Sequence, residues 1–103
     1  MTDQEIELLM NEREIRLNVV STEFTKLGYA SEAELLVCPG IGAYYAYVWL
    51  NKPDGREEQR EVNWEPSEPE IQSLGVRWAL RDPEAAVLDL IRTDIGRREE
   101  EAA

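Results

Sequence analysis

Carboxylates are the main side chains able to do chemistry in this 103-residue chain, which has 22 acidic residues, 11 basic residues and no histidine. The absence of histidine excludes imidazole acid–base catalysis, Ser-His and Cys-His nucleophilic pairs and most zinc sites. A pair of carboxylates could still act as in a glycosidase or bind Mg²⁺, but no spacing singles out such a pair. We therefore expect a protein that is not an enzyme, with no catalytic residue, no cofactor and no metal.

Acidic residues are dense in the segment 57–70, whose glutamates are Glu57, Glu58, Glu61, Glu65, Glu68 and Glu70. A solvated surface explains such a run, and contact with a basic surface of a partner is the alternative. If charge carries function in this chain, this run is the predicted site. The net charge of −11 disfavours direct binding to nucleic acid, because phosphates bind to basic surfaces.

The second candidate surface lies in the uncharged stretch 35–50, which reads LLVCPGIGAYYAYVWL. Its second half is rich in aromatic and β-branched residues, which favour a strand. Alternation places Tyr45, Tyr47 and Trp49 on one face, and the opposite face holds Tyr44, Ala46, Val48 and Leu50. Both faces are apolar, so helices should cover one, and a partner or a second copy is a candidate to cover the other. Core packing and a binding platform both remain open for the Tyr45, Tyr47 and Trp49 face.

Two smaller features of this stretch have plainer interpretations. Cys38 has no base or cation near it in sequence, which indicates a buried structural cysteine rather than a reactive thiol. Gly40-Ile41-Gly42 lacks the third glycine of a phosphate-binding loop and precedes a strand, so it predicts a turn or a bulge.

A β-hairpin follows the aromatic strand. Pro53-Asp54-Gly55 has the residues that a tight turn requires, with glycine supplying a positive φ. The predicted return strand is 56–64, in which Glu57 and Glu61 face water and Glu58 faces the other way.

The N-terminal third predicts a single long helix over residues 3–27. Thr2 and Glu5 fit a capping box, and Gly28 suits a left-handed helix end. Between them the apolar residues recur at steps of four and three, namely Ile6, Met10, Leu17, Val20, Phe24 and Leu27, with Arg13 in the same series. Such a stripe also fits a helix that pairs with a second copy of itself, which would make the protein a homodimer.

The C-terminal third predicts a loop, a third strand and a second helix. Val76, Trp78 and Leu80 alternate as in a strand, although residues 71–80 also fit a helix. Asp82-Pro83-Glu84 is a helix start, and Gly96 is a candidate helix end.

The predicted fold is therefore an α+β two-layer sandwich, in which an antiparallel β-meander of about three strands carries an N-terminal and a C-terminal helix on one face, in the order α-β-β-β-α. Residues 1–98 should form one domain and residues 99–103 a disordered acidic tail. A single cysteine and an acidic N-terminus point to the cytoplasm, and no apolar run is long enough to cross a membrane.

Three functional hypotheses follow from these observations. The first is a small acidic module for protein–protein interaction, such as an inhibitor, adaptor or immunity-type factor that binds a basic surface. The second is a self-assembling structural or assembly protein, for instance of a phage or mobile element. The third is a histidine-free enzyme that depends on carboxylates.

Overall fold

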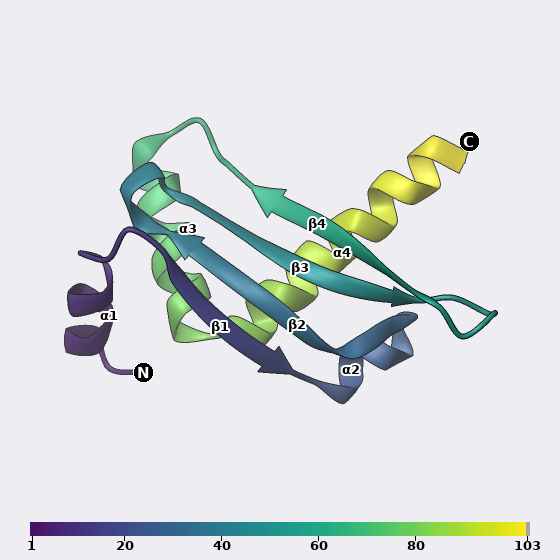
Figure 1. Ribbon diagram of the computed structural model, residues 1–103. Helices are drawn as coiled ribbons and strands as arrows, with labels where there is room; N and C mark the ends of the chain where they lie inside the picture. Colours follow the sequence, from purple (N-terminus) through teal and green to yellow (C-terminus); the bar gives the residue numbers. More distant parts are fainter. Residues whose placement is uncertain (103) are drawn as a thin grey trace.

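In the computed structural model, which describes residues 1–102, an antiparallel four-stranded sheet with the order β1-β2-β3-β4 packs against helices (Figure 1). The elements are α1 (Asp3–Leu9), β1 (Ile15–Val20), α2 (Thr22–Lys26), β2 (Tyr29–Cys38), the 3-10 turn η1 (Pro39–Ile41), β3 (Ala43–Asn51), β4 (Glu57–Trp64), α3 (Pro69–Arg81) and α4 (Pro83–Ala102). The predicted α+β class and antiparallel meander are confirmed, with four strands in place of about three.

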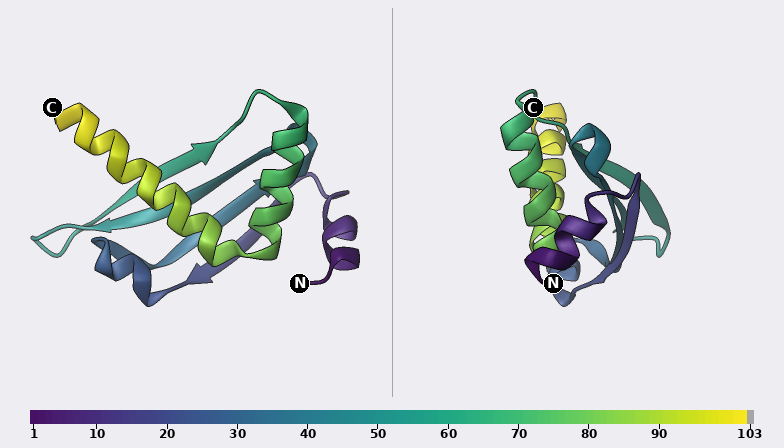
Figure 2. Two further views of the ribbon diagram at one scale, coloured as in Figure 1. Left: turned by 180° about the vertical axis from the view of Figure 1, so that it is seen from behind. Right: turned by 90° about the vertical axis from the view of Figure 1, so that its left-hand side faces the viewer.

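Helices α3 and α4 cover one face of the sheet, as the edge-on view in Figure 2 shows. Helix α1 lies at the end of this layer, where ion pairs join Glu7 to Arg77 and Asp3 to Arg81. Within residues 1–102 no helix covers the opposite face, which is turned toward the viewer in Figure 1. We call this opposite face the open face.

The core lies between the sheet and the helices. The register brings Leu17, Leu35, Ala46 and Val62 into one row across the four strands. The residues of α3 and α4 that bury their side chains in the same core are Val76, Ala79, Leu80, Ala86, Val87, Leu90 and Ile91. Burial of each large aliphatic side chain contributes about 1.5–3 kcal/mol, so this layer supplies most of the stabilisation.

The predicted single helix over residues 3–27 is wrong. The chain forms a short helix, an edge strand and a second short helix there. Ile15, Leu17 and Val19 alternate along β1 and pair with β2, so hydrogen bonding and packing at the sheet edge determine the structure of this segment. The predicted cap at Thr2 and the positive φ of Gly28 are both present, but Thr2 begins α1 and Gly28 follows α2. The predicted helix pairing through Arg13 has no helix to support it.

The predicted third strand at residues 76–81 is also wrong, because this segment belongs to α3. Val76, Ala79 and Leu80 are its buried residues, and their spacing of three and four is that of a helix face. Asp82 caps α4 as predicted, accepting a hydrogen bond from the Ala85 amide at 3.2 Å. Helix α4 then continues through Gly96 to Ala102, so the predicted end at Gly96 is wrong. Residues 99–102, which were predicted to be a disordered tail, form the last turn of α4 instead. Residue 103 lies outside the described residues.

The two turns of the β2-β3-β4 meander match the predictions. The Lys52 carbonyl accepts a hydrogen bond from the Gly55 amide at 3.0 Å, and Gly55 has a φ of 83°. Between β2 and β3, Gly42 follows η1 as its C-cap, and its φ of 66° and closeness to Gln72 leave no room for a side chain.

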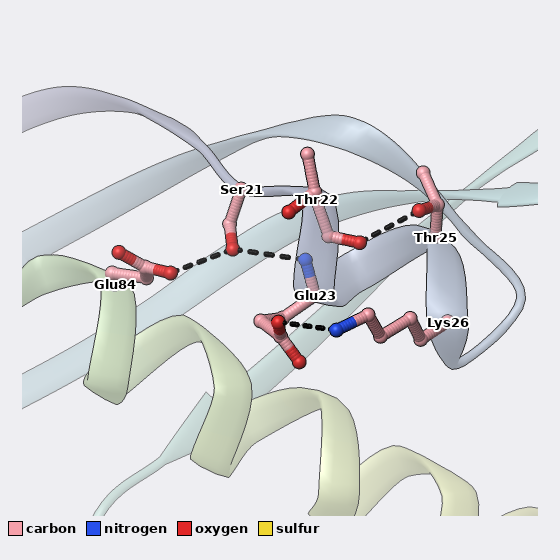
Figure 3. A network of polar contacts seen from close by, with 6 residues as sticks. All are labelled: Ser21, Thr22, Glu23, Thr25, Lys26 and Glu84. Atoms are coloured by element: carbon pink, nitrogen blue, oxygen red, sulfur yellow. Dashed lines mark hydrogen bonds and ion pairs between the residues drawn. The ribbon is translucent and has the colours of Figure 1, made fainter.

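A polar contact joins α2 to α4 across the edge of the core (Figure 3). The Ser21 hydroxyl accepts a hydrogen bond from the Glu23 amide at 3.2 Å, which caps α2. The same hydroxyl donates to Glu84 Oε1 at 2.6 Å. The short helix is thereby fastened to the first turn of α4.

A buried ionic cluster fastens the C-terminal half of α4 to the sheet. Asp94 is 4% exposed and accepts hydrogen bonds from the Tyr29 hydroxyl and from Arg60 Nε, the latter at 3.0 Å. Arg98 donates to the Tyr29 hydroxyl at 2.8 Å and lies 3.4 Å from the Asp94 carboxylate. The Asp94 carboxylate thus interacts with two guanidinium groups and a tyrosine hydroxyl. A buried charge is tolerated when it is paired in this way.

Candidate functional site

The candidate site is the open face of the sheet, and strand β3 runs through its middle. Tyr44, Ala46 and Val48 of β3 point to the helices and are buried. Tyr45, Tyr47 and Trp49 point the other way and are half-buried. The structure thus places this aromatic row on the face without a helix, so the alternative of core packing under a helix is wrong, and the binding-platform alternative stays a prediction.

The register of the sheet flanks Tyr47 with acidic side chains. Tyr47 pairs with Glu34 of β2 on one side and with Glu61 of β4 on the other. Directly opposed residues in an antiparallel pair have Cβ atoms about 4.5–5.5 Å apart, so the ring lies between two carboxylates. The pKa of Tyr47 is raised by partial burial and by the neighbouring charge of Glu61.

A small apolar cluster lies in the cross-strand row next to that of Tyr47. Leu36 is on the open face, opposite Arg16 of β1 and Tyr45 of β3, yet its side chain is 0% exposed. It lies outside the main core cluster, so neighbours on the open face cover it rather than α3 or α4. The ring of Tyr45 meets that of Tyr47 edge-on, with centroids 5.7 Å apart. This packing holds the two rings in a fixed arrangement.

Two shallow hollows flank Trp49. One, of about 350 Å³, is lined by Asn18, Val19, Val20, Glu32, Ala33, Glu34 and Trp49. The other, of about 310 Å³, is lined by Ala30, Ser31, Glu32, Trp49 and Glu57. They lie where the pairing of β2 with β3 is irregular, between Tyr29 and Ala33. A bulge of this kind spreads the side chains and leaves space beside the indole.

A cation of the chain itself already lies on this face. Arg16 of the edge strand β1 forms ion pairs with Glu14 at 2.7 Å and with Glu34 at 3.3 Å. Within residues 1–102, Glu32, Glu57 and Glu61 take part in no ion pair. The open face therefore combines half-buried aromatic rings with an excess of negative charge.

The structure divides the predicted acidic run. Glu57 and Glu61 lie on the open face, while Glu58 lies on the opposite face of β4 and pairs with Lys52 at 2.8 Å. That pairing lowers the pKa of Glu58. The other three glutamates, in the loop after β4 and in the first turn of α3, are exposed and add nothing to the aromatic row; they are Glu65, Glu68 and Glu70.

Glu32, Glu34 and Leu36 are site residues that the sequence analysis missed. The sequence analysis assigned no strand to residues 31–34, whereas this segment lies within β2. Alternation could have shown them, since the apolar residues Ala33, Leu35 and Val37 alternate with Glu32, Glu34 and Leu36 and so put these three on the other face.

Cys38 ends β2 beside this surface and is half-buried. Burial, and then the charges of Glu14 and Glu65, raise the pKa of its thiol. Cys38 is thus less buried than predicted, and a thiol with a raised pKa is a weak nucleophile at neutral pH.

Within residues 1–102, no cluster of three or more histidine, cysteine, aspartate or glutamate side chains is arranged to hold a metal ion. Within the same residues, no helix combines the length and the apolar character needed to cross a membrane. Comparison with protein-family models, with curated proteins and with solved structures finds no match to this chain.

Proposed function

We propose that the protein is a small acidic interaction module without enzymatic activity, which binds another protein through the open face of its sheet. The observation that carries the proposal is the half-buried row of Tyr45, Tyr47 and Trp49 on a face that no helix covers within residues 1–102. Aromatic residues are enriched at the centres of protein interfaces, where they supply large contact areas.

Charge indicates the kind of partner. Four glutamates surround the aromatic row, and one arginine, Arg16, lies among them. A partner with a basic surface would gain favourable potential on approach, and a partner with exposed phosphates would be repelled. The proposed role is that of an inhibitor, adaptor or immunity-type factor in the cytoplasm.

A pull-down with two tryptophan variants tests this proposal. The tagged chain, Trp49→Ala and Trp78→Ala are each incubated with nuclease-treated lysate of the source cells at low and high salt, and captured proteins are identified by mass spectrometry. Trp78 is the matched control because it is 37% exposed on α3, on the helix side of the sheet. We expect one stoichiometric partner that Trp78→Ala retains, that Trp49→Ala loses and that high salt weakens. Equal capture by all three proteins refutes the proposal.

Self-assembly is the second candidate function. Residues 3–27 do not form the long helix through which two copies were predicted to pair. Helix α3, however, exposes an apolar stripe of Ile71 (44%), Leu74 (67%) and Trp78 (37%). Burial of exposed apolar residues between identical copies would stabilise an oligomer. Sedimentation equilibrium of the wild type and of Leu74→Lys tests it. A wild type that stays monomeric at high concentration excludes this candidate.

A further inference from the structure

Building on the proposed function, we infer that the open face takes an extended segment of the partner, with two arginine or lysine side chains two residues apart that seat on Tyr47 and Trp49. Three features of the open face suit such an occupant: the acidic flanks of Tyr47, the hollows at Trp49 and the spacing between the two rings.

The Tyr47 position is suited to a cation. The ring lies in a cross-strand row with Glu34 on one side and Glu61 on the other. A guanidinium or ammonium group placed over the ring is attracted by its π-face and by both carboxylates.

The Trp49 position offers a second seat. Trp49 lines both hollows, of which the first also has Glu32 and Glu34 in its lining and the second Glu32 and Glu57. Tryptophan is the best aromatic partner for a cation. Asn18 and Val20 of β1 close the first hollow, and Val20, which is 65% exposed, can contact the aliphatic stem of a lysine or arginine.

Arg16 shows that a guanidinium fits on this face. Its side chain is 64% exposed and reaches Glu34 from the neighbouring strand at 3.3 Å. Arg16 therefore competes with an incoming cation for Glu34. Its removal should strengthen binding, an outcome opposite to the one expected if Arg16 were itself a contact for an acidic partner.

The spacing selects an extended occupant. Tyr47 and Trp49 are two residues apart on one strand, which corresponds to about 6.7 Å. Alternate side chains of an extended segment have the same spacing and point to the same side, whereas adjacent side chains point apart. Beyond Tyr47, the row of Leu36, Tyr45 and Asn63 carries no carboxylate, so an apolar side chain suits the next position.

Two synthetic peptides of identical composition test the spacing. The first is Ser-Leu-Ser-Arg-Ser-Arg-Ser-Leu-Ser, which presents the pattern in either direction, and the second is Ser-Leu-Ser-Ser-Arg-Arg-Ser-Leu-Ser. Each is titrated into the ¹⁵N-labelled full chain at low salt, and the three tryptophan indole signals, assigned by substitution, report the place of binding. We expect the first peptide to shift the Trp49 indole and the Tyr47 amide, and to bind at least about three-fold more tightly than the second.

Matched variants test the charges. Glu61→Gln should weaken binding about two- to five-fold, while Glu58→Gln, on the opposite face of the same strand, should leave it unchanged. Arg16→Gln should strengthen binding by a similar factor, while Arg56→Gln, with the same change of charge at the hairpin tip, should not. Spectra of each variant confirm that the fold is retained.

The outcomes separate this inference from the proposed function. No shift of the Trp49 indole at about 5 mM peptide, or equal affinity for the two peptides, overturns the inference. If the pull-down nevertheless shows a partner that Trp49→Ala loses, the open face is still the binding surface and its occupant is of another kind. If Trp49→Ala retains every partner, the proposed function fails, whatever the peptides do.

Discussion

The contact between Gly75 of α3 and Trp64 of β4 gives the sharpest test of how the helix layer sits on the sheet. In a helix, glycine is about 0.8–1.0 kcal/mol less favourable than alanine, so Gly75→Ala should be stabilising on propensity alone. A Cβ at Gly75, however, would approach the Trp64 ring closer than 3.0 Å. The ring has little freedom to move away, since it packs on Tyr44 with centroids 4.9 Å apart.

The magnitude follows from these two opposing effects. Overpacking of this kind costs about 1–3 kcal/mol. After the gain in propensity, Gly75→Ala should destabilise the protein by up to about 2 kcal/mol. Gly96 is the matched control, because it lies in the interior of α4 and a Cβ added there would meet nothing within 4 Å. Gly96→Ala should stabilise by about 0.5–1 kcal/mol, which raises the Tm by about 4–8 °C per kcal/mol.

Urea unfolding followed by circular dichroism measures both variants, and a double-mutant cycle identifies the cause. In a Trp64→Leu background the clash is absent, so Gly75→Ala should become stabilising, with a coupling energy of about 1–3 kcal/mol. If Gly75→Ala stabilises the wild type as much as Gly96→Ala does, α3 does not pack against β4 as described. A cycle without coupling leads to the same conclusion.

Three further predictions concern polar and ionisable side chains in and around the core. Ser21→Ala removes a helix cap and leaves Glu84 unpaired, so it should cost about 1–2 kcal/mol in urea unfolding, against about 0.5 kcal/mol for Thr2→Ala at the exposed cap of α1. Asp94→Asn should lower stability by about 1–2 kcal/mol, because its two arginine partners lose their counter-charge but remain about one third exposed to water. Burial raises the pKa of Tyr29 and of Tyr44 from 10 to about 12, and the bond to Asp94 adds to the shift at Tyr29. Both hydroxyls stay protonated in the folded state up to a higher pH than in the unfolded chain, so the free energy of unfolding should keep their full contribution below pH 10 and fall as the pH rises from 10 to 12. An alkaline absorbance titration in which all four tyrosines ionise near pH 10 without unfolding would contradict this.

Local signals predicted the β3-β4 hairpin and the start of α4. Pro53-Asp54-Gly55 and Asp82-Pro83-Glu84 each specify their backbone through the residues themselves, so no distant contact is needed. The segment 15–20 is different. Its residues fit a helical stripe and a strand alternation equally well, and only pairing with β2 decides between them.

Helix α3 shows the reverse error. The spacing of Ile71, Leu74 and Trp78 is helical, but these are the exposed residues of the helix, and the buried face is formed by Val76, Ala79 and Leu80. In α3 the smaller side chains face the core because Tyr44 and Trp64 already fill the space between helix and sheet. A helix face chosen from hydrophobicity alone would therefore be the wrong one, since the volume available beneath a helix depends on the sheet that it covers.

The candidate site could be predicted only in part for a related reason. Alternation along β3 is a property of one strand, so the aromatic row of Tyr45, Tyr47 and Trp49 follows from sequence alone. The carboxylates beside Tyr47 come from two other strands, and Glu34 and Glu61 meet the ring only through the register of the sheet. A run of charge in sequence is split between the two faces of a strand, as Glu58 and Glu61 are, while charges far apart in sequence converge. Charge complementarity on a sheet is therefore set by register, and substitutions that test it should be matched by face rather than by position in the chain.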